Sequence, residues 1–440
     1  MLGQVIHPVI FFFYKIINRL WYLYWYFVVI MPYEVYARFV CRLDPKLYSE
    51  KRRILGVSEG HRSHEGKRFA IFVIYTKADI QVFTRTAIDA LNARGINIVF
   101  VTNMRASGDV REDLLDNCHL LIERENLGRD FGAYKDGFSL LRKREPVIDK
   151  LILMNDSVYY LPNGLDEIFA KLDANEPFIG LTEVFEHHYH VQSFLLAFNR
   201  DVIEAPAFLE YWDKYLPIST RRWSVHKGEV GLTKCVLRKV GQGPHIIVNP
   251  VEVYNILVGM DFGELRSTID LVPFRNRNLL RKQLYKLIEM RSSQAISEEA
   301  LAQGQFIERF ADLVNTARAK GTSLADDDDV TKALDLRYDF QSRRNLSDFK
   351  VAEFIEGYVK LLTERNQIHF GGFLYYKFLG IPILKRDLVY RGVYTFEQIN
   401  KIIDELDLPF AEEIRVDIRS KGMGRYYKGL KKVLFRYGSI

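Results

Sequence analysis

Hydrophobic and polar positions follow two different periods along residues 68–156. Short apolar, β-branched runs at 68–75, 96–103, 118–124 and 150–156 are typical of strands. Amphipathic segments at 79–95 and 131–145 lie between these runs and are typical of helices. Strand, helix and strand in this order form right-handed βαβ units with parallel strands. The pattern predicts an α/β fold, with a Rossmann-like, mostly parallel sheet and helices on both faces.

The alternation becomes less regular from residue 177 onward. Further strands are expected at 191–198 and 245–250, and a helix at 229–241 that ends at Gly241. Beyond residue 262 the chain is charged and has helical periodicity. We therefore divide the chain as follows: 1–48, an aromatic helical segment; 49–66, a connector; 67–262, the sheet core; 263–440, a helical C-terminal region.

Residues 7–32 are almost entirely apolar or aromatic, interrupted only by Lys15, Asn18 and Arg19. A membrane-spanning helix needs about 20 mostly apolar residues, and the uncharged run at 20–31 is shorter than this. Trp and Tyr side chains favour the membrane interface. We expect this segment to lie on or dip into the inner leaflet of a membrane; a true span and a helix buried in the protein are alternatives. No small-residue cleavage site follows the run, which argues against a signal peptide.

Composition narrows the class of protein. Hydrophobic residues make up 48% and charged residues 27% of the 440 positions, which excludes wholesale disorder. Cys41, Cys118 and Cys235 are far apart and form no CxxC pair, so a disulfide scaffold or a zinc site is not expected, and a reducing cytoplasm fits. The net charge of +6 is spread along the chain and predicts no nucleic-acid partner.

Polar residues follow each predicted parallel strand, and the carboxyl ends of such strands meet at one edge of a sheet, where ligands bind. The segment 126–138, NLGRDFGAYKDGF, is the most distinctive. Gly128 permits close approach of the backbone to a ligand, and the Arg129 guanidinium suits phosphate oxygens. Alternatively, Asp130 caps the following helix and Arg129 joins a surface ion pair. Spacing alone leaves both interpretations open.

Asn155, Asp156 and Ser157 end the last strand of this series. The Asp156 carboxylate could hold Mg²⁺ or Mn²⁺ together with nucleotide phosphates, because these ions accept water and substrate oxygens as further ligands. It could equally bond backbone donors in the following turn.

Five stretches in a fixed order resemble the rhamnan-synthesis F family of bacterial polysaccharide glycosyltransferases. They are ENLGRDFGAYKDGF, LILMNDSVYYLP, HVQSFLLAFNRDVI, GEVGLTKCVLRKVG and NQIHFGGFLYYKFLGIPILKRDLV, and the resemblance covers roughly residues 68–395. It implies a GT-A fold that acts on a nucleotide-activated sugar, commonly dTDP-L-rhamnose, and extends a lipid-linked oligosaccharide that becomes a surface polysaccharide such as O-antigen. We expect the transfer to invert configuration and to take place at the cytoplasmic face of a bacterial inner membrane. Enzymes of this fold usually carry a DXD metal motif, whose first Asp is replaced here by Asn155.

The resemblance also implies roles for single residues. Tyr75 and Asn103 would lie near the nucleotide base, and Asn126, Arg129, Asp130 and Asn155 would line the nucleotide-sugar pocket. Asp156 and His369 would face a metal ion and the diphosphate, and Lys385 or Arg386 would contact phosphate. Residues 366–395 would thus return to complete the active site.

Sugar transfer with inversion needs a base for the acceptor hydroxyl. Glu229, expected at the start of a helix beside the donor, is our choice, and Asp130 is the competing base. A Glu that complements a helix dipole is the alternative for Glu229. Two further stretches could suggest metal binding, but we favour other interpretations. Asp326–Asp329 are expected to form a solvated loop. His187, His188 and His190 are expected to contact the acceptor or to form a plain loop.

Overall fold

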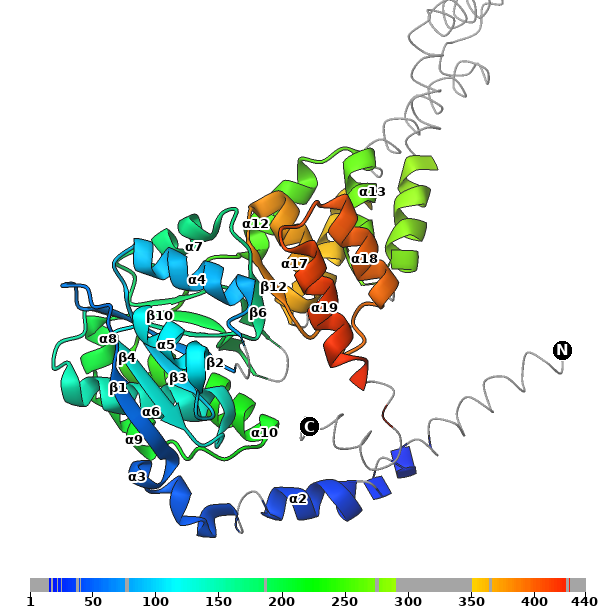
Figure 1. Ribbon diagram of the computed structural model, residues 1–440. Coiled ribbons are helices and arrows are strands. Elements are labelled where there is room, and N and C mark those ends of the chain that lie inside the picture. Colours follow the sequence, from blue (N-terminus) through cyan, green and yellow to red (C-terminus); the bar gives the residue numbers. More distant parts are fainter. Residues whose placement is uncertain are drawn as a thin grey trace, which may run out of the picture.

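The computed structural model describes residues 41–75, 79–185, 188–273, 277–289, 350–363 and 366–424, together with Tyr427 and parts of 16–39. Two features singled out in the sequence, Asp326–Asp329 and His187, lie outside the described residues. The ribbon is shown in Figure 1.

An eight-stranded sheet, in the order β1-β4-β3-β2-β5-β10-β7-β11, forms the centre of the described chain. Its strands are β1 (Ile54–Glu59), β2 (Arg68–Ile74), β3 (Asn97–Thr102), β4 (Leu120–Arg124), β5 (Lys150–Asn155), β7 (Phe178–Gly180), β10 (Leu195–Asn199) and β11 (His245–Ile246). The four strands β4, β3, β2 and β5 are parallel, as is the pair β7 and β11. Strands β1 and β10 run antiparallel to their neighbours. The predicted fold class, an α/β protein with a mostly parallel sheet and flanking helices, is confirmed.

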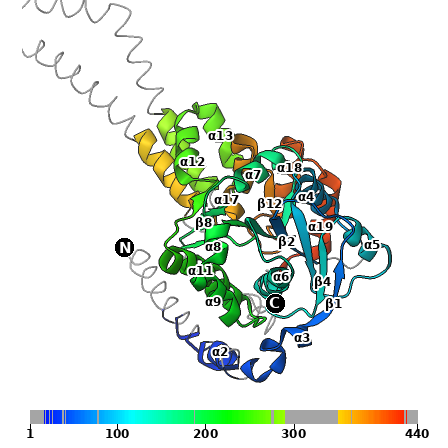
Figure 2. The ribbon, with the colours of Figure 1, turned by 90° about the vertical axis from the view of Figure 1, so that its left-hand side faces the viewer.

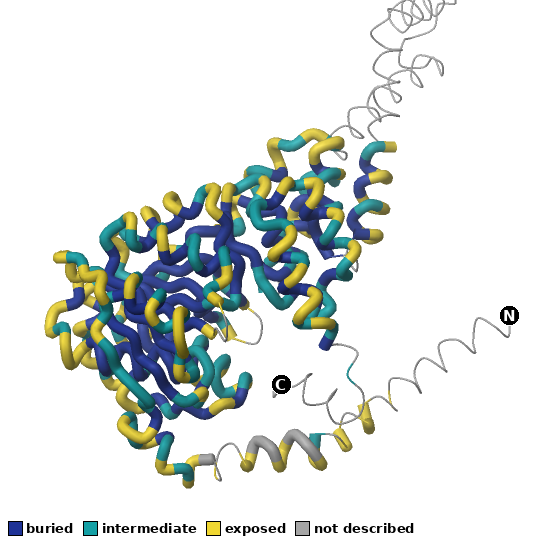
Figure 3. Tube along the Cα trace, in the orientation of Figure 1, coloured by how far each residue is buried: buried dark blue, intermediate teal, exposed yellow. Residues whose placement is uncertain are grey.

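Helices cover both faces of this sheet (Figures 1 and 2). Phe69, Ile71 and Val73 of β2 pack in one cluster with side chains of α6 (Arg129–Arg144), α8 (Arg200–Glu204) and α9 (Pro206–Lys214). Ala70 and Phe72 lie in the cluster on the opposite face, with α4 (Val82–Ala93), α5 (Gly108–Asp116) and α7 (Leu165–Leu172). Since successive strand residues point to opposite faces, a continuous apolar run of this kind is buried on both sides. Figure 3 shows the strands as the buried interior of the molecule.

The region expected as a connector, 49–66, is structured, so that expectation is wrong for part of it. Residues Glu50–Arg53 form helix α3, and Ile54–Glu59 form strand β1, which pairs with β4 at the sheet edge. Five of the six residues of β1 are half-buried, which is typical of an edge strand. A strand of this composition, ILGVSE, has weak apolar alternation, and its pairing partner is more than 60 residues away in sequence.

The helical run that carries Glu229 begins earlier than predicted. It starts with α10 (Arg221–Trp223) and continues through the π-helical turn η5 (Ser224–Glu229), α11 (Val230–Cys235) and the π-helical turn η6 (Val236–Val240). It ends at Gly241, whose φ of 80° is a common helix end, as expected. Glu229 therefore lies inside a helical run and not at its start, which removes the helix-dipole explanation for this residue.

The C-terminal region is helical and folds back against the sheet core. Helices α12 (Pro250–Val258), α13 (Phe262–Asp270), α17 (Gln367–Leu379), α18 (Phe396–Glu405) and α19 (Ala411–Lys421) belong to it, and 277–289 and 350–363 are also helical. Strand β12 (Ile383–Lys385) pairs antiparallel with β6 (Val158–Tyr160), which directly follows β5. This pairing brings residues 383–386 to the carboxyl end of β5. The short strands β8 (Glu183–Val184) and β9 (His190–Val191) form a separate pair.

The described part of the N-terminal segment exposes large apolar side chains. It contains the π-helical turn η1 (Tyr26–Ile30) and α2 (Met31–Val35), which stand clear of the folded body in Figures 1 and 3. The exposed side chains include those of Leu20, Trp21, Phe27, Met31, Val35 and Phe39. Among the described residues, no helix combines the length and the apolarity needed to cross a membrane.

The end of this segment packs on the core, so the expected boundary at residue 48 is too late. Leu47 is buried. The backbone oxygens of Lys46 and Leu47 accept hydrogen bonds from the Arg53 guanidinium at 2.7 and 3.0 Å. The Lys46 ammonium also pairs with Glu125 at 2.7 Å. Residues from about 44 onward are thus part of the folded body.

Candidate active site

Polar side chains from several segments meet at the carboxyl ends of β5 and its neighbours. The Asn155 side-chain amide donates a hydrogen bond to the Asp130 carboxylate at 3.0 Å. One carboxylate oxygen of Asp156 accepts the backbone N–H of Tyr75 at 2.8 Å. Ser157 donates its backbone N–H to the Asn155 side-chain oxygen at 3.1 Å. The ends of β2, β5 and the start of α6 therefore share one site, as the strand order predicts.

Asp130 does not cap helix α6. The cap position is Gly128, with φ 77°, and no side-chain hydrogen bond caps this end of the helix. A Cβ atom at Gly128 would lie 2.5 Å from the Cα of Pro217, so only glycine fits there. The next residue, Arg129, also has a positive φ of 54°, which is uncommon for a residue with a side chain. Such strained backbone is often found at functional sites, and it directs Asp130 toward Asn155 in place of a capping position.

The charges at this site shift one another's pKa values. Burial and the neighbouring Asp156 carboxylate raise the pKa of Asp130 to about 6, although Lys385 and Arg129 act in the opposite direction. Burial also raises the pKa of Asp156. Burial lowers the pKa of the Lys385 ammonium, while Asp387 and Glu229 raise it. Carboxylates and cations that affect each other's pKa values in this way lie near one another.

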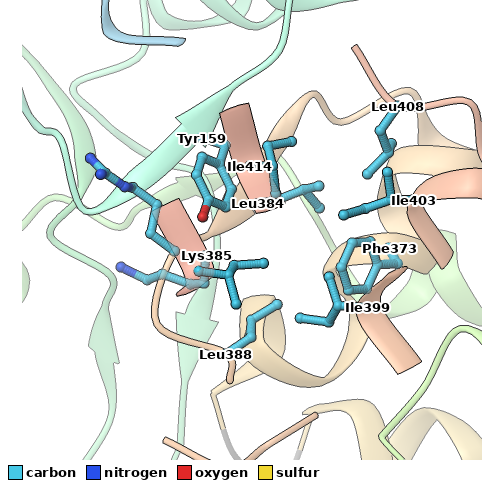
Figure 4. A pocket seen from close by; sticks show the side chains of 11 residues that line it. Tyr159, Phe373, Leu384, Lys385, Leu388, Ile399, Ile403, Leu408 and Ile414 are labelled. Atoms are coloured by element: carbon cyan, nitrogen blue, oxygen red, sulfur yellow. The ribbon is translucent and has the colours of Figure 1, made fainter. Parts of the chain in front are cut away.

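Lys385, at the end of β12, is the cation that faces the carboxyl ends of the strands. Its ammonium donates to the Ser157 hydroxyl at 2.9 Å and lies 4.5 Å from the centre of the Phe194 ring. Figure 4 shows an apolar pocket of the C-terminal region, lined by residues such as Leu384, Phe373 and Ile403, with the Lys385 amine pointing away from it. This pocket is part of the core between β12 and the C-terminal helices.

Arg386, the other predicted phosphate contact, is held by the protein itself. Its guanidinium donates to the Asp417 carboxylate at 2.6 and 3.2 Å and to the Asp156 backbone oxygen at 2.9 Å. It also lies over the rings of Phe83 and Tyr159. The pairing with Arg386 and Lys421 lowers the pKa of Asp417 to about 2. Arg386 thus fixes helix α19 to the end of β5, and Lys385 is the better placed of the two for phosphate.

Glu229 is brought to the site by close packing of two helices. A Cβ atom at Gly228 would lie 2.6 Å from the ring of Phe131 in α6, so the glycine lets the two helices touch. The Glu229 carboxylate accepts the Ser193 hydroxyl at 2.7 Å, and its second oxygen lies 3.5 Å from His190 Nε2. The charge of Glu229 contributes to the pKa values of both Asp130 and Lys385. Both candidate bases therefore face the same site.

The residues expected near the nucleotide base are placed at the same edge. Tyr75 is half-exposed. Asn126, which is expected in the nucleotide-sugar pocket, is exposed in the loop before α6. The Asn103 side-chain oxygen accepts a hydrogen bond from Arg124 at 2.5 Å. No contact of these residues tests a role in base recognition, which stays a prediction.

His369 lies at the first turn of α17 and pairs with Asp387. Its Nε2 is 3.0 Å from an Asp387 oxygen, and its buried Nδ1 has no hydrogen-bond partner. Burial lowers the pKa of His369, while the pairing holds the pKa of Asp387 well below its usual value. Among the described residues, no group of three or more His, Cys, Asp or Glu side chains could hold a metal ion. Within the described part of the chain, Asp156 and His369 therefore do not belong to a three-ligand protein site.

A buried ion group behind the Gly128 loop escaped the sequence analysis. Asp136 of α6 accepts both the Arg53 and the Arg124 guanidinium, at 2.5 and 2.8 Å, and all three side chains are at most 2% exposed. Arg124 further donates to the Leu127 backbone oxygen at 2.6 Å, directly before the loop glycine. This group holds in place the residue that directly precedes the Gly128 loop. Charged residues in an amphipathic helix and a strand look like surface residues in sequence, so no pattern signals the group.

Part of the chain matches a model of a known protein family. Residues 98–302 match the family model of rhamnan synthesis protein F. The match is consistent with the family that the sequence motifs predict. The rhamnan synthesis protein F match includes the Gly128 loop, β5 and the Glu229 helical run.

Curated relatives are similar over parts of the chain. An uncharacterised protein y4gN of Sinorhizobium fredii is 28% identical over 223 residues, which is 48% of this chain and 58% of the relative. Virulence protein VirA of Vibrio anguillarum is 33% identical over 154 residues, which is 34% of this chain and 48% of the relative. The chain spans about half the length of the curated relatives it matches.

Two solved structures overlap with the chain at 12% sequence identity. One is a putative nucleotide-diphospho-sugar transferase from Desulfovibrio desulfuricans, with a TM-score of 0.27, covering 40% of this chain and 78% of its own. The other is a glycosyltransferase involved in glycosylation of the major capsid of PBCV-1, with a TM-score of 0.26, covering 41% of this chain and 82% of its own.

Proposed function

We propose that this protein is a glycosyltransferase of the GT-A type that uses a nucleotide-diphospho-sugar in polysaccharide synthesis. The observation that carries the proposal is the meeting of Asp130, Asn155, Asp156 and Lys385 at the carboxyl edge of the sheet. The match to rhamnan synthesis protein F supports it. A diphosphate would lie against the Lys385 ammonium and the Arg129 guanidinium, beside the strained loop at Gly128.

Mg²⁺ or Mn²⁺ is proposed as the cofactor, bound by Asp156 and by the phosphate oxygens of the donor. A single carboxylate fits these ions, because Mg²⁺ keeps several waters and is commonly held by one or two carboxylates plus substrate phosphates. When bound, the ion would neutralise negative charge on the leaving diphosphate. Lys385 contributes to the same neutralisation without a metal, so we expect metal dependence to be partial.

Glu229 is proposed as the base of an inverting transfer. Its carboxylate would remove the acceptor hydroxyl proton while the acceptor oxygen bonds to the anomeric carbon and the diphosphate leaves with the bonding electron pair. Ser193 and His190 hold the carboxylate in place. Asp130 is less suitable, because its carboxylate is already bonded to Asn155 and lies beside Asp156.

For the donor we propose dTDP-L-rhamnose, and for the acceptor a lipid-linked oligosaccharide at the inner-membrane surface. The name of the matching family supports the sugar. The exposed apolar and aromatic side chains of residues 20–39 support a membrane surface, since Trp, Tyr and Phe insert at the interface.

A non-catalytic module that binds donor and organises polysaccharide assembly is the second candidate. The observation in its favour is Asn155, which replaces the first Asp of the usual metal motif. A retaining transferase of another sugar is a further alternative, with the same donor site.

A donor screen tests the proposal. Nucleotide sugars are added singly to the purified full chain, and unfolding temperature is measured, because a ligand that binds the folded state stabilises it. We expect dTDP-L-rhamnose to give the largest shift, and release of dTDP once a lipid-linked oligosaccharide is supplied. Stabilisation without release from any donor would favour the non-catalytic module, and no stabilisation by any nucleotide sugar would contradict both.

The membrane proposal has its own test. Deletion of residues 1–40 should move the protein from the membrane to the soluble fraction, while the deletion keeps Leu47 and the carbonyls that hold Arg53. A matched variant with Trp21, Phe27 and Phe39 changed to Ser should behave in the same way if the aromatic side chains are the anchor. A full chain that is soluble throughout would contradict the proposal.

A further inference from the structure

The loop at 190–193 holds both oxygens of the Glu229 carboxylate. Ser193 donates its hydroxyl to one oxygen at 2.7 Å, and His190 Nε2 lies 3.5 Å from the other, at the upper limit of a hydrogen bond. His190 is 5% exposed, so water does not compete freely for its ring. A histidine expected as an acceptor contact or plain loop is therefore the direct neighbour of the proposed base.

The tautomer of His190 is fixed by its own loop. Nδ1 lies 2.8 Å from the backbone oxygen of His188. A carbonyl oxygen only accepts hydrogen bonds, so Nδ1 carries a hydrogen in both charge states of the ring. Nε2 is then the atom that gains or loses a proton.

Nε2 has a partner in either charge state. The Gln192 side-chain nitrogen lies 3.5 Å from it and can donate when the ring is neutral. The Gln192 amide is oriented for this, because its oxygen accepts a hydrogen bond from the Asn366 side chain at 2.8 Å. When Nε2 is protonated, it can donate to Glu229. The Nε2 atom itself thus has a hydrogen-bond partner both before and after it receives a proton.

We propose that His190 is a positioning residue that takes over the acceptor proton from Glu229 during sugar transfer. The inference rests on the proposed glycosyltransferase function. The acceptor oxygen forms its bond to the anomeric carbon, and the bond to the diphosphate oxygen breaks with its electron pair. The hydroxyl proton passes to Glu229 and from there to Nε2, which gives an imidazolium with both nitrogens protonated. After the product leaves, the proton returns from Nε2 to Glu229, which is 20% exposed, and passes from there to water, so that the ring is neutral again.

Gln192 and Asn366 belong to the same arrangement. Asn366 directly precedes α17, so the C-terminal region orients the loop that holds the base. The sheet core alone would leave the Gln192 amide free to rotate away from His190.

Two substitutions of His190 separate orientation from proton transfer. His190→Ala removes both functions, and His190→Gln keeps a donor for Glu229 but has no site for the proton. We expect kcat to fall about 100-fold in both variants, with the KM for the donor unchanged. His61→Ala is the matched control with wild-type kcat, because this exposed histidine pairs with Asp116 and belongs to no part of the proposed site. Donor-induced stabilisation confirms that each variant is folded.

The double variant Glu229→Gln/His190→Ala completes the experiment. If His190 acts through Glu229, the second substitution lowers kcat no further. A His190→Gln variant with wild-type kcat, or a further fall in the double variant, would contradict the inference while wild-type activity upholds the proposed function. Absence of transfer by the wild type would instead overturn the proposed function, and the inference with it.

Discussion

The side chain of Asn155 donates a hydrogen bond to the carboxylate of Asp130, 3.0 Å away. Enzymes of the GT-A fold usually carry the first Asp of the DXD metal motif at the position of Asn155. An aspartate there would set a second carboxylate against Asp130, whose pKa is already raised to about 6 by burial and Asp156. The amide is therefore the group that this arrangement of carboxylates requires, and its presence does not by itself indicate lost activity.

The substitution Asn155→Asp should lower the stability of the folded protein. Like charges within hydrogen-bond distance destabilise one another, so we expect a loss on the order of 2 kcal/mol in the free energy of unfolding at pH 7, together with weaker donor binding. Urea denaturation and donor titration measure the two effects. Asn155→Ser, which adds no charge, is the control. Tighter Mn²⁺ and donor binding by Asn155→Asp would show instead that the site lacks a metal ligand.

The raised pKa of Asp130 predicts a pH-dependent stability. Between about pH 4 and 6 the folded protein keeps a proton that the unfolded chain has lost, so stability from this group falls as pH rises through that window. Asp130→Asn should therefore gain stability relative to wild type, by on the order of 2–3 kcal/mol between pH 4 and pH 7. Denaturation of both proteins across this range checks it, and a constant difference would contradict the assignment.

Glu229→Gln should lower kcat on the order of 1,000-fold and leave donor affinity nearly unchanged, because a base acts on the acceptor hydroxyl. The amide keeps a hydrogen-bonding group for Ser193, so the fold is retained. Glu183→Gln, a nearby carboxylate bonded to Tyr189, is the matched control. Transfer rates and donor titrations give the measurement, and an active Glu229→Gln protein would rule this residue out.

Lys385 and Arg386 are adjacent in sequence, but alanine substitutions at the two positions should have different effects. Lys385→Ala removes a cation that faces the carboxyl edge, so donor affinity should fall about 10- to 100-fold with little change in stability. Arg386→Ala leaves Asp417 with Lys421 as its remaining cation and should lower the free energy of unfolding by about 3 kcal/mol. Donor titration and denaturation of the two variants distinguish these roles. Equal losses of affinity would contradict them.

Gly228→Ala should displace Glu229. The added methyl would meet the Phe131 ring at 2.6 Å, so the helical run must move away from α6. We expect a loss of about 1–3 kcal/mol in stability and a fall in kcat larger than the change in donor KM. Gly357→Ala, with no atom within 4 Å of the added group, is the control and should stabilise its helix by up to about 1 kcal/mol. Wild-type kcat in Gly228→Ala would show that this contact does not place the base.

The sequence determined the core of the sheet. The apolar runs of β2, β3, β4 and β5 are buried on both faces, and burial of this extent leaves few other structures for such runs. Because the carboxyl ends of parallel strands lie at one edge of the sheet, the same pattern predicted that Asn155, Asp156 and Asp130 lie close together. The order of the motifs also predicted the family, and it predicted that residues 366–395 return to the active site.

Only the tertiary structure decided how the site residues divide their roles. Strand β1 and the Arg53, Asp136 and Arg124 group depend on partners distant in sequence, and a single sequence does not reveal such pairings. The contact between Gly228 and Phe131, which brings Glu229 to the site, depends on the packing of two helices. Hydrophobic periodicity specifies which face of an element is buried, whereas the partner on that face follows from shape and charge in three dimensions.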